Sequence, residues 1–316
     1  MSIEQEIKDR ALALGFDAVG ITDASPIDSE EVERLRAWLA SGRAGQMAYL
    51  HRNFEKRVDP GSLLEGARSV IVVALNYKLR EEEATDPAPD AKFGTVAEYA
   101  RYEDYHDFMR PLLHELAQRV REATGEKHRF KVCVDSVPLA ERALAVRAGL
   151  GFIGKNHMFI HPKLGPQVFL GEVVTTASLV PDDPVAGVCI SCGRCVRMCP
   201  TGALEADGQF DARKCISYLT IEHKGAIEPE LAKQVGDRVF GCDQCVSVCP
   251  HRHGAPARAN APFRFYPGRA RLELGRTGAM TAESFAAEFE GSPISRAGLD
   301  GLGRNAQICM DNAQNG

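Results

Sequence analysis

The chain of 316 residues is 44% hydrophobic and 26% charged, an ordinary globular composition that excludes a fibrous repeat and a chain disordered throughout. Its longest strongly apolar run, Val70 to Leu75, is far shorter than the ~20 residues that a membrane-spanning helix needs. The net charge is −5, and the charged N-terminus carries no signal-peptide pattern, so we expect a cytoplasmic protein with no membrane partner.

Hydrophobic spacing in the first half predicts helices mixed with strands. The predicted helices cover residues 3–14, 28–42, 104–123 and 138–147, and the predicted strands cover 17–22, 69–77, 130–134, 158–161 and 168–176. Residues 80–90 are acidic and broken by proline, which is typical of a solvated loop, and 181–187 resemble a linker. A short amphipathic helix at 281–289 and a glycine-broken helical end complete an α+β chain.

Cysteine is the most informative residue type, because eight of the ten cysteines lie within 61 residues of a chain without an export signal. The first motif reads Cys189-x2-Cys192-x2-Cys195-x3-Cys199-Pro, and the second reads Cys242-x2-Cys245-x3-Cys249-Pro. The first is the complete bacterial ferredoxin run for a 4Fe-4S cluster. The second lacks its first cysteine, whose place Val239 takes.

Ligand exchange between the motifs assigns two clusters, because the last cysteine of each run binds the other cluster in two-cluster ferredoxins. Cys215 is the other cysteine within the module and completes the second set. The expected sets are Cys189, Cys192, Cys195 and Cys249, and then Cys199, Cys215, Cys242 and Cys245. Two zinc sites are the competing interpretation, but zinc does not need the full run. The module indicates an electron carrier or a redox enzyme.

Other motifs allow a functional and a structural interpretation. Gly149-x-Gly151-x-x-Gly154 matches the dinucleotide fingerprint, but a helix precedes it and a strand follows, so NAD binding is not expected. Asp135 follows an apolar strand, where it either faces a ligand crevice or caps the next helix. Arg57 could hold an anionic group or pair with a neighbouring acid, and buried Cys133 fits a core position.

Between His251 and Arg276, six arginines stand against one acidic residue, so this stretch carries a charge of +5. A basic segment on an acidic protein suits a polyanion. Its interleaved aromatic residues, Phe263, Phe265 and Tyr266, could provide stacking surfaces.

Taken together, these residues resemble the epoxyqueuosine reductases, a family of cobalamin-dependent iron–sulfur enzymes that complete queuosine at the wobble position of tRNA. The resemblance covers nearly the whole chain. It is carried by EKRVDP at 55–60, DYH at 104–106, DSVPLAER at 135–142, AGLGFIGKN at 148–156, FLGE at 169–172, CISYLTIE at 215–222, FGCDQC at 240–245, GSPISR at 291–296 and RN at 304–305. Two departures are the His251-Arg252-His253 sequence after the second motif and the absence of longer helical repeats after Asn305.

The resemblance implies a base-off cobalamin between the N-terminal domain and the cluster module, with electrons passing through two 4Fe-4S clusters. It implies that Asp135 is the proton donor. The residues matching corrinoid contacts are Arg57, Tyr99, Asp135, Asn156, Ser217 and Asp243. Cobalamin rests on the resemblance alone, because the D-x-H-x-x-G motif of other cobalamin proteins is absent: Asp104-Tyr-His106 is followed by Met109 at the glycine position.

The expected substrate is a tRNA anticodon stem-loop that carries epoxyqueuosine, bound by a monomer that receives electrons from an unidentified donor. The expected RNA contacts are His223, Lys224, Arg264, Arg269 and Arg271. The expected division is a cobalamin-binding mixed-sheet domain over 1–184, a ferredoxin-type domain over 185–255 and an arginine-rich wrap with a short helical end over 256–316.

Two other functions remain open from the sequence. A reductive dehalogenase uses a similar cofactor set, but such enzymes typically carry a twin-arginine signal and need no basic RNA-binding face. A ferredoxin-like electron-transfer protein would need the cysteine module and no substrate of its own.

Overall fold

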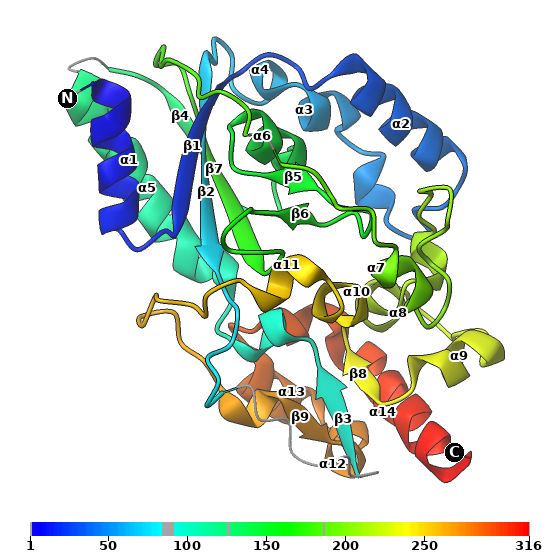
Figure 1. The fold of residues 1–316 in the computed structure, drawn as a ribbon. Coiled ribbons are helices and arrows are strands. Elements are labelled where there is room, and N and C mark those ends of the chain that lie inside the picture. The colour runs from blue at the N-terminus through cyan, green and yellow to red at the C-terminus, as the bar shows by residue number, and fades with distance from the viewer. Residues whose placement is uncertain (1, 84–91, 125–126, 186, 316) are drawn as a thin grey trace.

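A four-stranded antiparallel sheet lies at the centre of the N-terminal half (Figure 1). Its strands, in spatial order, are β1 (Ala18–Asp23), β2 (Ser69–Asn76), β7 (Val168–Thr175) and β4 (Phe130–Cys133). Every residue of β2 is buried, as expected for a valine- and isoleucine-rich strand with a neighbour on each edge.

Alternate residues of β2 serve two separate cores, because successive side chains of a strand point to opposite faces. Ile71 belongs to the core shared with α1 (Ile3–Ala13) and α5 (Tyr105–Thr124). Val72 belongs to the core shared with α6 (Glu141–Arg147). Figure 1 accordingly shows α1 and α5 on one side of the sheet and α6 on the other.

The structure is a computed structural model that describes residues 2–83, 92–124, 127–185 and 187–315. Residues 84–90 of the predicted acidic loop lie outside the described residues. The remaining elements of the first half are α2 (Ser29–Ala40), η1 (Ala48–Leu50), α3 (Phe54–Val58), α4 (Pro60–Leu63), η2 (Glu98–Arg101), β5 (Phe152–Ile153) and β6 (Phe159–Ile160).

The cysteine-rich part is built from short helices that the cysteine loops interrupt. Its elements are α7 (Arg194–Arg197), η3 (Ala212–Lys214), α8 (Ile216–Ile221), α9 (Pro229–Val235), β8 (Arg238–Phe240), α10 (Gln244–Ser247) and α11 (Pro250–His253). Figure 1 places α7, α10 and α11 together beneath the β5–β6 hairpin.

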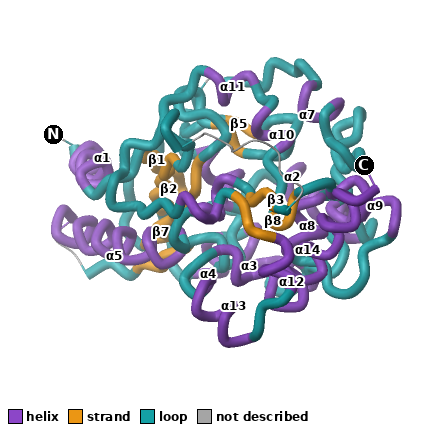
Figure 2. Tube along the Cα trace, turned by 90° about the horizontal axis from the view of Figure 1, so that it is seen from below, coloured by secondary structure: helices purple, strands orange, loops and turns teal. Residues whose placement is uncertain are grey.

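A second sheet joins distant parts of the chain. In it, β3 (Phe93–Val96) pairs in parallel with β8 and antiparallel with β9 (Arg271–Glu273). One strand therefore comes from each of the three segments expected from the sequence. The C-terminal elements that pack near it are η4 (Pro267–Arg269), α12 (Leu274–Gly278), α13 (Ala282–Phe289), η5 (Pro293–Ala297) and α14 (Gly298–Asn315). Figures 1 and 2 both place α14 beside β8.

The α+β prediction is confirmed, and the mixed pairing occurs in the three-stranded sheet, whereas the four-stranded sheet is antiparallel. The helix predicted from Pro138 begins at Glu141 instead, because the preceding residues form the turn after β4. The strands β3, β8 and β9 were not predicted, since three or four residues carry too little periodicity. Within the described residues, no helix is both long and apolar enough to span a membrane.

Candidate active site

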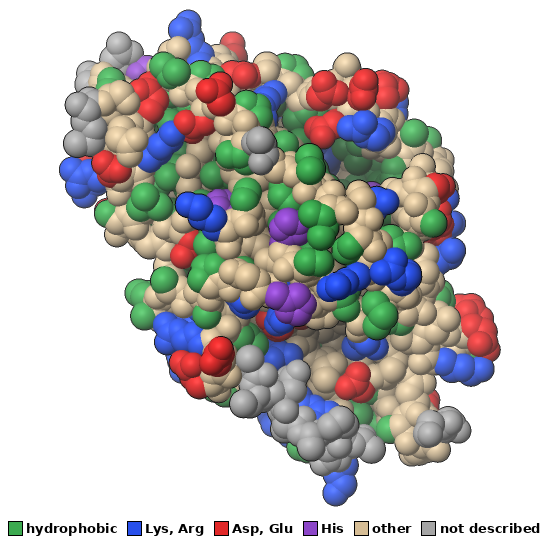
Figure 3. All heavy atoms as spheres, in the orientation of Figure 1, with side chains coloured by type: hydrophobic (Ala, Val, Ile, Leu, Met, Phe, Trp, Pro, Cys, Tyr) green, Lys and Arg blue, Asp and Glu red, His purple; other side chains and the backbone are tan. Residues whose placement is uncertain are grey.

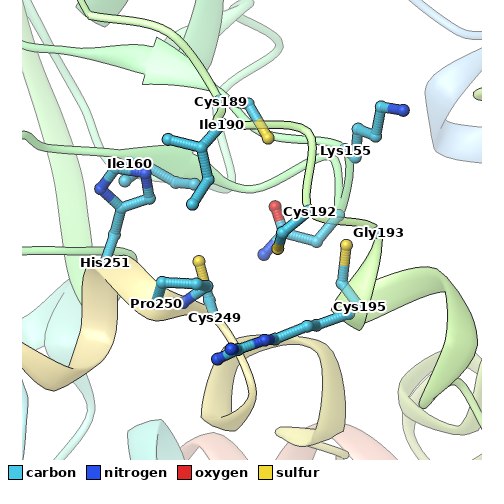
Figure 4. Close-up of a pocket in the computed structure, with 12 residues that line it drawn as sticks. Lys155, Ile160, Cys189, Ile190, Cys192, Gly193, Cys195, Cys249, Pro250 and His251 are labelled. Atoms are coloured by element: carbon cyan, nitrogen blue, oxygen red, sulfur yellow. The ribbon is translucent and has the colours of Figure 1, made fainter.

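Four cysteines from two separate motifs line one open recess, which we call the first cysteine site. They are Cys189, Cys192, Cys195 and Cys249. The recess has an empty volume of about 330 Å3, and Figure 4 shows the four sulfurs around it. Burial raises the pKa of the Cys249 thiol, and charge on Cys189 and Cys192 raises it further, so these groups lie within electrostatic range.

The other four module cysteines form another group, the second cysteine site, which consists of Cys199, Cys215, Cys242 and Cys245. Burial raises the pKa of the Cys245 thiol, with further contributions from the other three cysteines. Burial also raises the pKa of Cys242 to about 11. Cys215 joins this group because it lies between η3 and α8, at the N-cap of α8.

Two groups of four thiols are the number that two 4Fe-4S clusters need. Among the residues that the structure describes, no three histidine, cysteine or acidic side chains are placed to hold a single metal ion. Zinc would draw its sulfur ligands to about 2.3 Å from one centre, whereas a 4Fe-4S cluster spreads four thiolates over a larger body. The two sets of four match those expected from ligand exchange between the motifs.

Asp135 lies in the turn between β4 and α6 with a positive φ of 45°, a conformation uncommon for a residue other than glycine. Its backbone N–H donates to Glu141 Oε1 at 2.6 Å, and this contact holds the turn against the start of α6. Its side chain is 63% exposed. The carboxylate is therefore available to a bound molecule while its backbone is fixed.

Two side chains at the start of α5 contact the Asp135 carboxylate. Tyr105 donates its hydroxyl to Asp135 Oδ2 at 3.0 Å, and His106 Nε2 lies 3.5 Å from the same oxygen. Asp104 orients His106, because its Oδ1 lies 2.7 Å from His106 Nδ1. The ring of Tyr105 is fixed by stacking on Phe169, with centroids 4.3 Å apart.

The charges of this group are set by opposing effects. Burial alone would lower the pKa of His106, but its hydrogen bonds to Asp104 and Asp135 raise that pKa to about 9. Partial removal of water by the surrounding protein would raise the pKa of Asp135, but hydrogen bonding and charge from His106, with help from Tyr105 and Arg142, lower it. At neutral pH the proton of the pair therefore resides on His106.

A pair of buried carboxyl groups lies behind Asp135. Glu172 on β7 is fully buried, and neither of its side-chain oxygens has a hydrogen-bond partner among the described residues. Burial, followed by the charge of Glu141, raises the pKa of Glu172. Burial, followed by the charge of Asp135, raises the pKa of Glu141. These environments favour the neutral forms of both groups behind an ionised Asp135.

Tyr99 and Asp243 connect the Asp135 region with the second cysteine site. Burial raises the pKa of Tyr99, and the charges of Asp243 and Asp135 add to this effect, so Tyr99 lies within electrostatic range of both. Asp243 follows Cys242 directly, and its Oδ2 accepts the backbone N–H of Glu98 at 2.6 Å. Both residues are partly buried.

Asn156 and Ser217 contact the loop of the second motif. Asn156 Nδ2 donates to the carbonyl of Cys245 at 3.3 Å, and its Oδ1 accepts the backbone N–H of Met158 at 3.2 Å. Ser217 Oγ lies 3.5 Å from the carbonyl of Cys242. These two side chains therefore help to position the cysteine loop.

Arg57 lies on α3, far from Asp135 in the sequence but within electrostatic range of it. Burial lowers its pKa, and the charges of Tyr49, Glu141 and Asp135 oppose that effect. Its Nε is buried and has no hydrogen-bond partner among the described residues. An unsatisfied buried donor of this kind is suited to an anionic or carbonyl group of a bound cofactor.

The five residues expected to contact RNA lie in two segments. Lys224 Nζ donates to the carbonyl of Ala297 at 3.1 Å, and His223 Nε2 lies 2.9 Å from the carbonyl of Ala226. In the other segment, Arg264 and Arg269 contact the ring of Tyr266, at 4.5 and 3.8 Å from its centroid.

The second of these segments also includes Arg271. It packs against residues 102–103, which directly precede Asp104. Arg269 Nη1 donates to the carbonyl of Tyr102 at 2.7 Å, and the backbone N–H of Glu103 donates to the Arg264 carbonyl at 3.0 Å. These contacts lie immediately before Asp104. The segment thus brings positive charge toward the edge of the Asp135 site.

The idea that Phe263 offers a stacking surface is wrong. Its side chain is fully buried and stacks on Tyr102, with ring centroids 4.7 Å apart. Arg258 is also structural, because it is buried and pairs with Glu83 at 2.7 Å. Part of the basic segment therefore anchors the chain to the N-terminal core.

Sequence reasoning missed the partners of Asp135. Tyr105, His106, Glu141 and Glu172 all lie inside the quoted family motifs, but nothing in their spacing assigned them to one group. The signal that could have found them is the position of Asp104-Tyr-His at a helix start and of Glu172 in an otherwise apolar strand.

The chain is similar to proteins of one family over nearly its whole length. Residues 188–252 match the model of a 4Fe-4S double cluster binding domain, and residues 57–136 match that of Epoxyqueuosine reductase QueG, DUF1730. The epoxyqueuosine reductase of Xanthomonas campestris pv. campestris is 38% identical over an alignment that covers 97% of this chain and 86% of the relative.

Solved structures of epoxyqueuosine reductases match the fold. One, in complex with a tRNA-Tyr epoxyqueuosine-modified stem loop, has a TM-score of 0.90 and 32% identity, covering 99% of this chain and 82% of the other. Another, from Bacillus subtilis, is described with its catalytic aspartate loop swung out of the active site. It has a TM-score of 0.89 and 31% identity, with the same coverage of 99% and 82%.

Proposed function

Because the chain belongs to the epoxyqueuosine reductase family, we propose that it reduces epoxyqueuosine in tRNA to queuosine. The observation that carries this proposal is the match, over 99% of this chain, to the reductase solved with its modified stem loop. The near-full-length relatives favour this function over a dehalogenase or a simple electron carrier. In the reaction, the epoxide oxygen leaves as water and an alkene remains, which consumes two electrons and two protons.

The electrons would pass through the double-cluster domain. We assign one cluster to the first cysteine site and the other to the second, on the basis of the two groupings of thiols. The second site lies on the side of Tyr99 and Asp135, whereas the first lies at an open recess. Electrons would therefore enter at the first site and leave from the second.

A base-off cobalamin fits between the second cysteine site and Asp135. The unsatisfied Nε of Arg57 supports a bound polar group there, and Tyr99 and Asp243 border the same region. Asn156 and Ser217 would contribute from the cysteine loop. When bound, the corrinoid would supply a strongly nucleophilic or reducing centre, and the protein would supply position and protons.

Asp135 is the proposed proton donor, and His106 is the nearest charged group that can resupply it. In the substrate-free protein Asp135 is ionised and His106 carries the proton. A proton passed from His106 to Asp135 would move onto the epoxide oxygen as its carbon–oxygen bond breaks. Tyr105 would hold Asp135 Oδ2 in place during this transfer.

The Asp135 turn would have to stay in place for this step. The corresponding loop of the Bacillus subtilis relative is described as swung out of the active site. In this chain the hydrogen bond from the Asp135 N–H to Glu141 would hold the turn against the start of α6. Glu141 therefore acts as a positioning residue for Asp135.

The RNA would approach from the side where basic groups flank the site. His223 and Lys224 follow α8, and Arg264, Arg269 and Arg271 belong to the segment packed before Asp104. Arginines beside an aromatic ring such as Tyr266 suit a splayed anticodon loop, which offers both phosphates and bases.

The three segments would divide this work. Residues 1–184 would bind the cobalamin and perform catalysis, 185–255 would carry electrons, and 256–316 would support RNA binding. We place the reaction in the cytoplasm, where tRNA is modified, and expect a monomer supplied by a separate electron donor.

The test is the nucleoside content of tRNA from a strain that lacks its own epoxyqueuosine reductase. Expression of this chain should replace epoxyqueuosine by queuosine in digested tRNA analysed by mass spectrometry. Asp135→Asn serves as the matched control. Persistent epoxyqueuosine, despite soluble protein with its normal iron content, would contradict the proposal.

A further inference from the structure

Exposed apolar side chains concentrate beside the first cysteine site. Three of the nine large hydrophobic side chains exposed among the described residues lie within residues 188–198, the segment that carries the first three cysteines of this site. Val188 is 78% exposed, Ile190 60% and Met198 51%. Isolated exposed aliphatic residues are ordinary, but a group of them around one site is typical of an interaction surface.

The charge of this surface is positive. Between Val188 and Pro200 the sequence contains no acidic residue, whereas Arg194 and Arg197 are both exposed on α7. Lys155 lines the same recess and is exposed as well. Figure 3 shows Lys and Arg side chains gathered over α7, although the whole protein carries a net charge of −5.

The surface borders the recess of the first cysteine site. Ile190 and Arg194 line the recess together with the four cysteines of the first site (Figure 4 shows Ile190 beside it). The neighbours of the second site are instead Tyr99, Asp243 and the Asp135 region.

We propose that the surface formed by Val188, Ile190, Arg194, Arg197 and Met198 is the docking site of an acidic electron-carrier protein. An apolar centre with a charged rim is the usual construction of a protein interface. The positive rim would steer an acidic carrier and speed its encounter. This proposal rests on the proposed function, which needs an external reductant.

An RNA is a poorer occupant for this surface. Nucleic-acid sites combine positive charge with aromatic rings on which bases stack. The exposed side chains here are aliphatic, and no aromatic residue lies between Val188 and Pro200. The residues proposed to contact RNA come from other segments, at 223–224 and 264–271.

The step at this surface is a simple electron transfer. The reduced carrier loses one electron, and the oxidised first cluster gains it. No bond forms or breaks, and no proton moves. Two such encounters supply the electrons that one epoxide requires.

The test measures how fast a protein carrier reduces the clusters of the reconstituted holoprotein. The probe is reduced flavodoxin, an acidic flavin protein, mixed anaerobically in a stopped-flow instrument while cluster absorbance is followed. Arg194→Glu should lower the second-order rate constant by about tenfold or more, because electrostatic steering commonly contributes that much. The double variant Val188→Ser/Met198→Ser should lower it as well, because it removes the apolar centre of the interface. The matched controls are Arg10→Glu and Leu12→Ser on α1, where Arg10 is exposed and Leu12 is 48% exposed.

Reduction by dithionite, which needs no docking, separates docking from cluster damage. The proposal predicts normal dithionite reduction, normal iron content and a weaker salt dependence for Arg194→Glu with flavodoxin. Unchanged flavodoxin rates in both surface variants would overturn it, and so would a loss of tRNA affinity with unchanged rates. If chemically reduced wild-type enzyme does not convert epoxyqueuosine in tRNA to queuosine, that result would count against the proposed function instead.

Discussion

The cysteine module and the Asp135 site are built in different ways. The module takes its chemistry from short motifs, in which the chain spacing itself brings Cys189, Cys192 and Cys195 to one recess. The Asp135 site takes its chemistry from single side chains on separate elements, such as His106 on α5 and Glu172 on β7. The module therefore specifies what is bound, whereas the Asp135 site specifies where a proton resides.

This difference predicts that the two regions can be disabled separately. Loss of a module cysteine should remove a cofactor, while changes around Asp135 should leave iron content intact and slow the chemistry. Iron content and turnover, measured on the same preparation, distinguish the two regions in every variant below.

The largest effect is expected from Cys215→Ala. Because one of four ligands of the second cluster is lost, the protein should retain about half of its iron and sulfide and lose turnover entirely. Cys133→Ala is the matched control, since Cys133 is buried in the core outside the module. Two complete clusters in Cys215→Ala would show that the ligand assignment is wrong.

Asp135→Asn should have the next largest effect. The amide keeps the shape of the side chain but cannot donate the carboxyl proton, so single-turnover reduction should slow by about 10²–10⁴-fold. Iron and corrinoid content should match those of the wild type. Asp107→Asn, an exposed change on α5, is the control. A wild-type rate in Asp135→Asn would remove this residue from the proton path.

The two groups of four module cysteines agree with the assignment made from the sequence, in which motif spacing and ligand exchange placed seven of them and Cys215 was added as the remaining module cysteine. That these groups bind clusters stays a prediction. The main helices and the central strand β2 could also be predicted, since long periodic segments signal clearly. The partners of Asp135 could not, because Tyr105 and Glu141 meet it only through the turn after β4. The ionised state of Asp135 depends on His106, whose Nε2 lies 3.5 Å from Asp135 Oδ2. A sequence does not specify the distance between these two atoms.

Glu141→Ala should have a smaller effect than loss of the acid itself. The variant removes the acceptor of the Asp135 N–H, a hydrogen bond worth about 1–1.5 kcal/mol, so turnover should fall by about tenfold. Glu141→Gln retains an acceptor oxygen and should keep most of the rate. Equal losses in the two variants would mean that the charge of Glu141, rather than its hold on the turn, matters.

Arg264→Gln should weaken tRNA binding by a few-fold and leave the rate at saturating tRNA nearly unchanged. A lost phosphate contact should lower the salt slope of binding by about 0.7–0.9. Arg276→Gln is the control within the same basic segment, because Arg276 pairs with Glu288 instead. Unchanged affinity and salt slope would assign Arg264 a structural role beside Tyr266.

The smallest effect concerns the pH profile. The pKa of His106 is raised to about 9, so its proton is present at neutral pH and is lost as the pH rises through that value. Turnover with chemically reduced enzyme should therefore fall above about pH 9. Asp104→Asn removes a hydrogen bond that raises this pKa, so the fall should begin at lower pH. An identical profile in Asp104→Asn would exclude His106 as the proton reservoir.

The most direct test of the whole account is an electron-counted single turnover. The purified holoprotein, loaded with clusters and cobalamin, is given limiting reductant and excess tRNA that carries epoxyqueuosine, and the nucleosides are then analysed by mass spectrometry. The account predicts one queuosine, lighter than its precursor by one oxygen atom, for every two electrons supplied. Full oxidation of the reduced protein without formation of queuosine would contradict it.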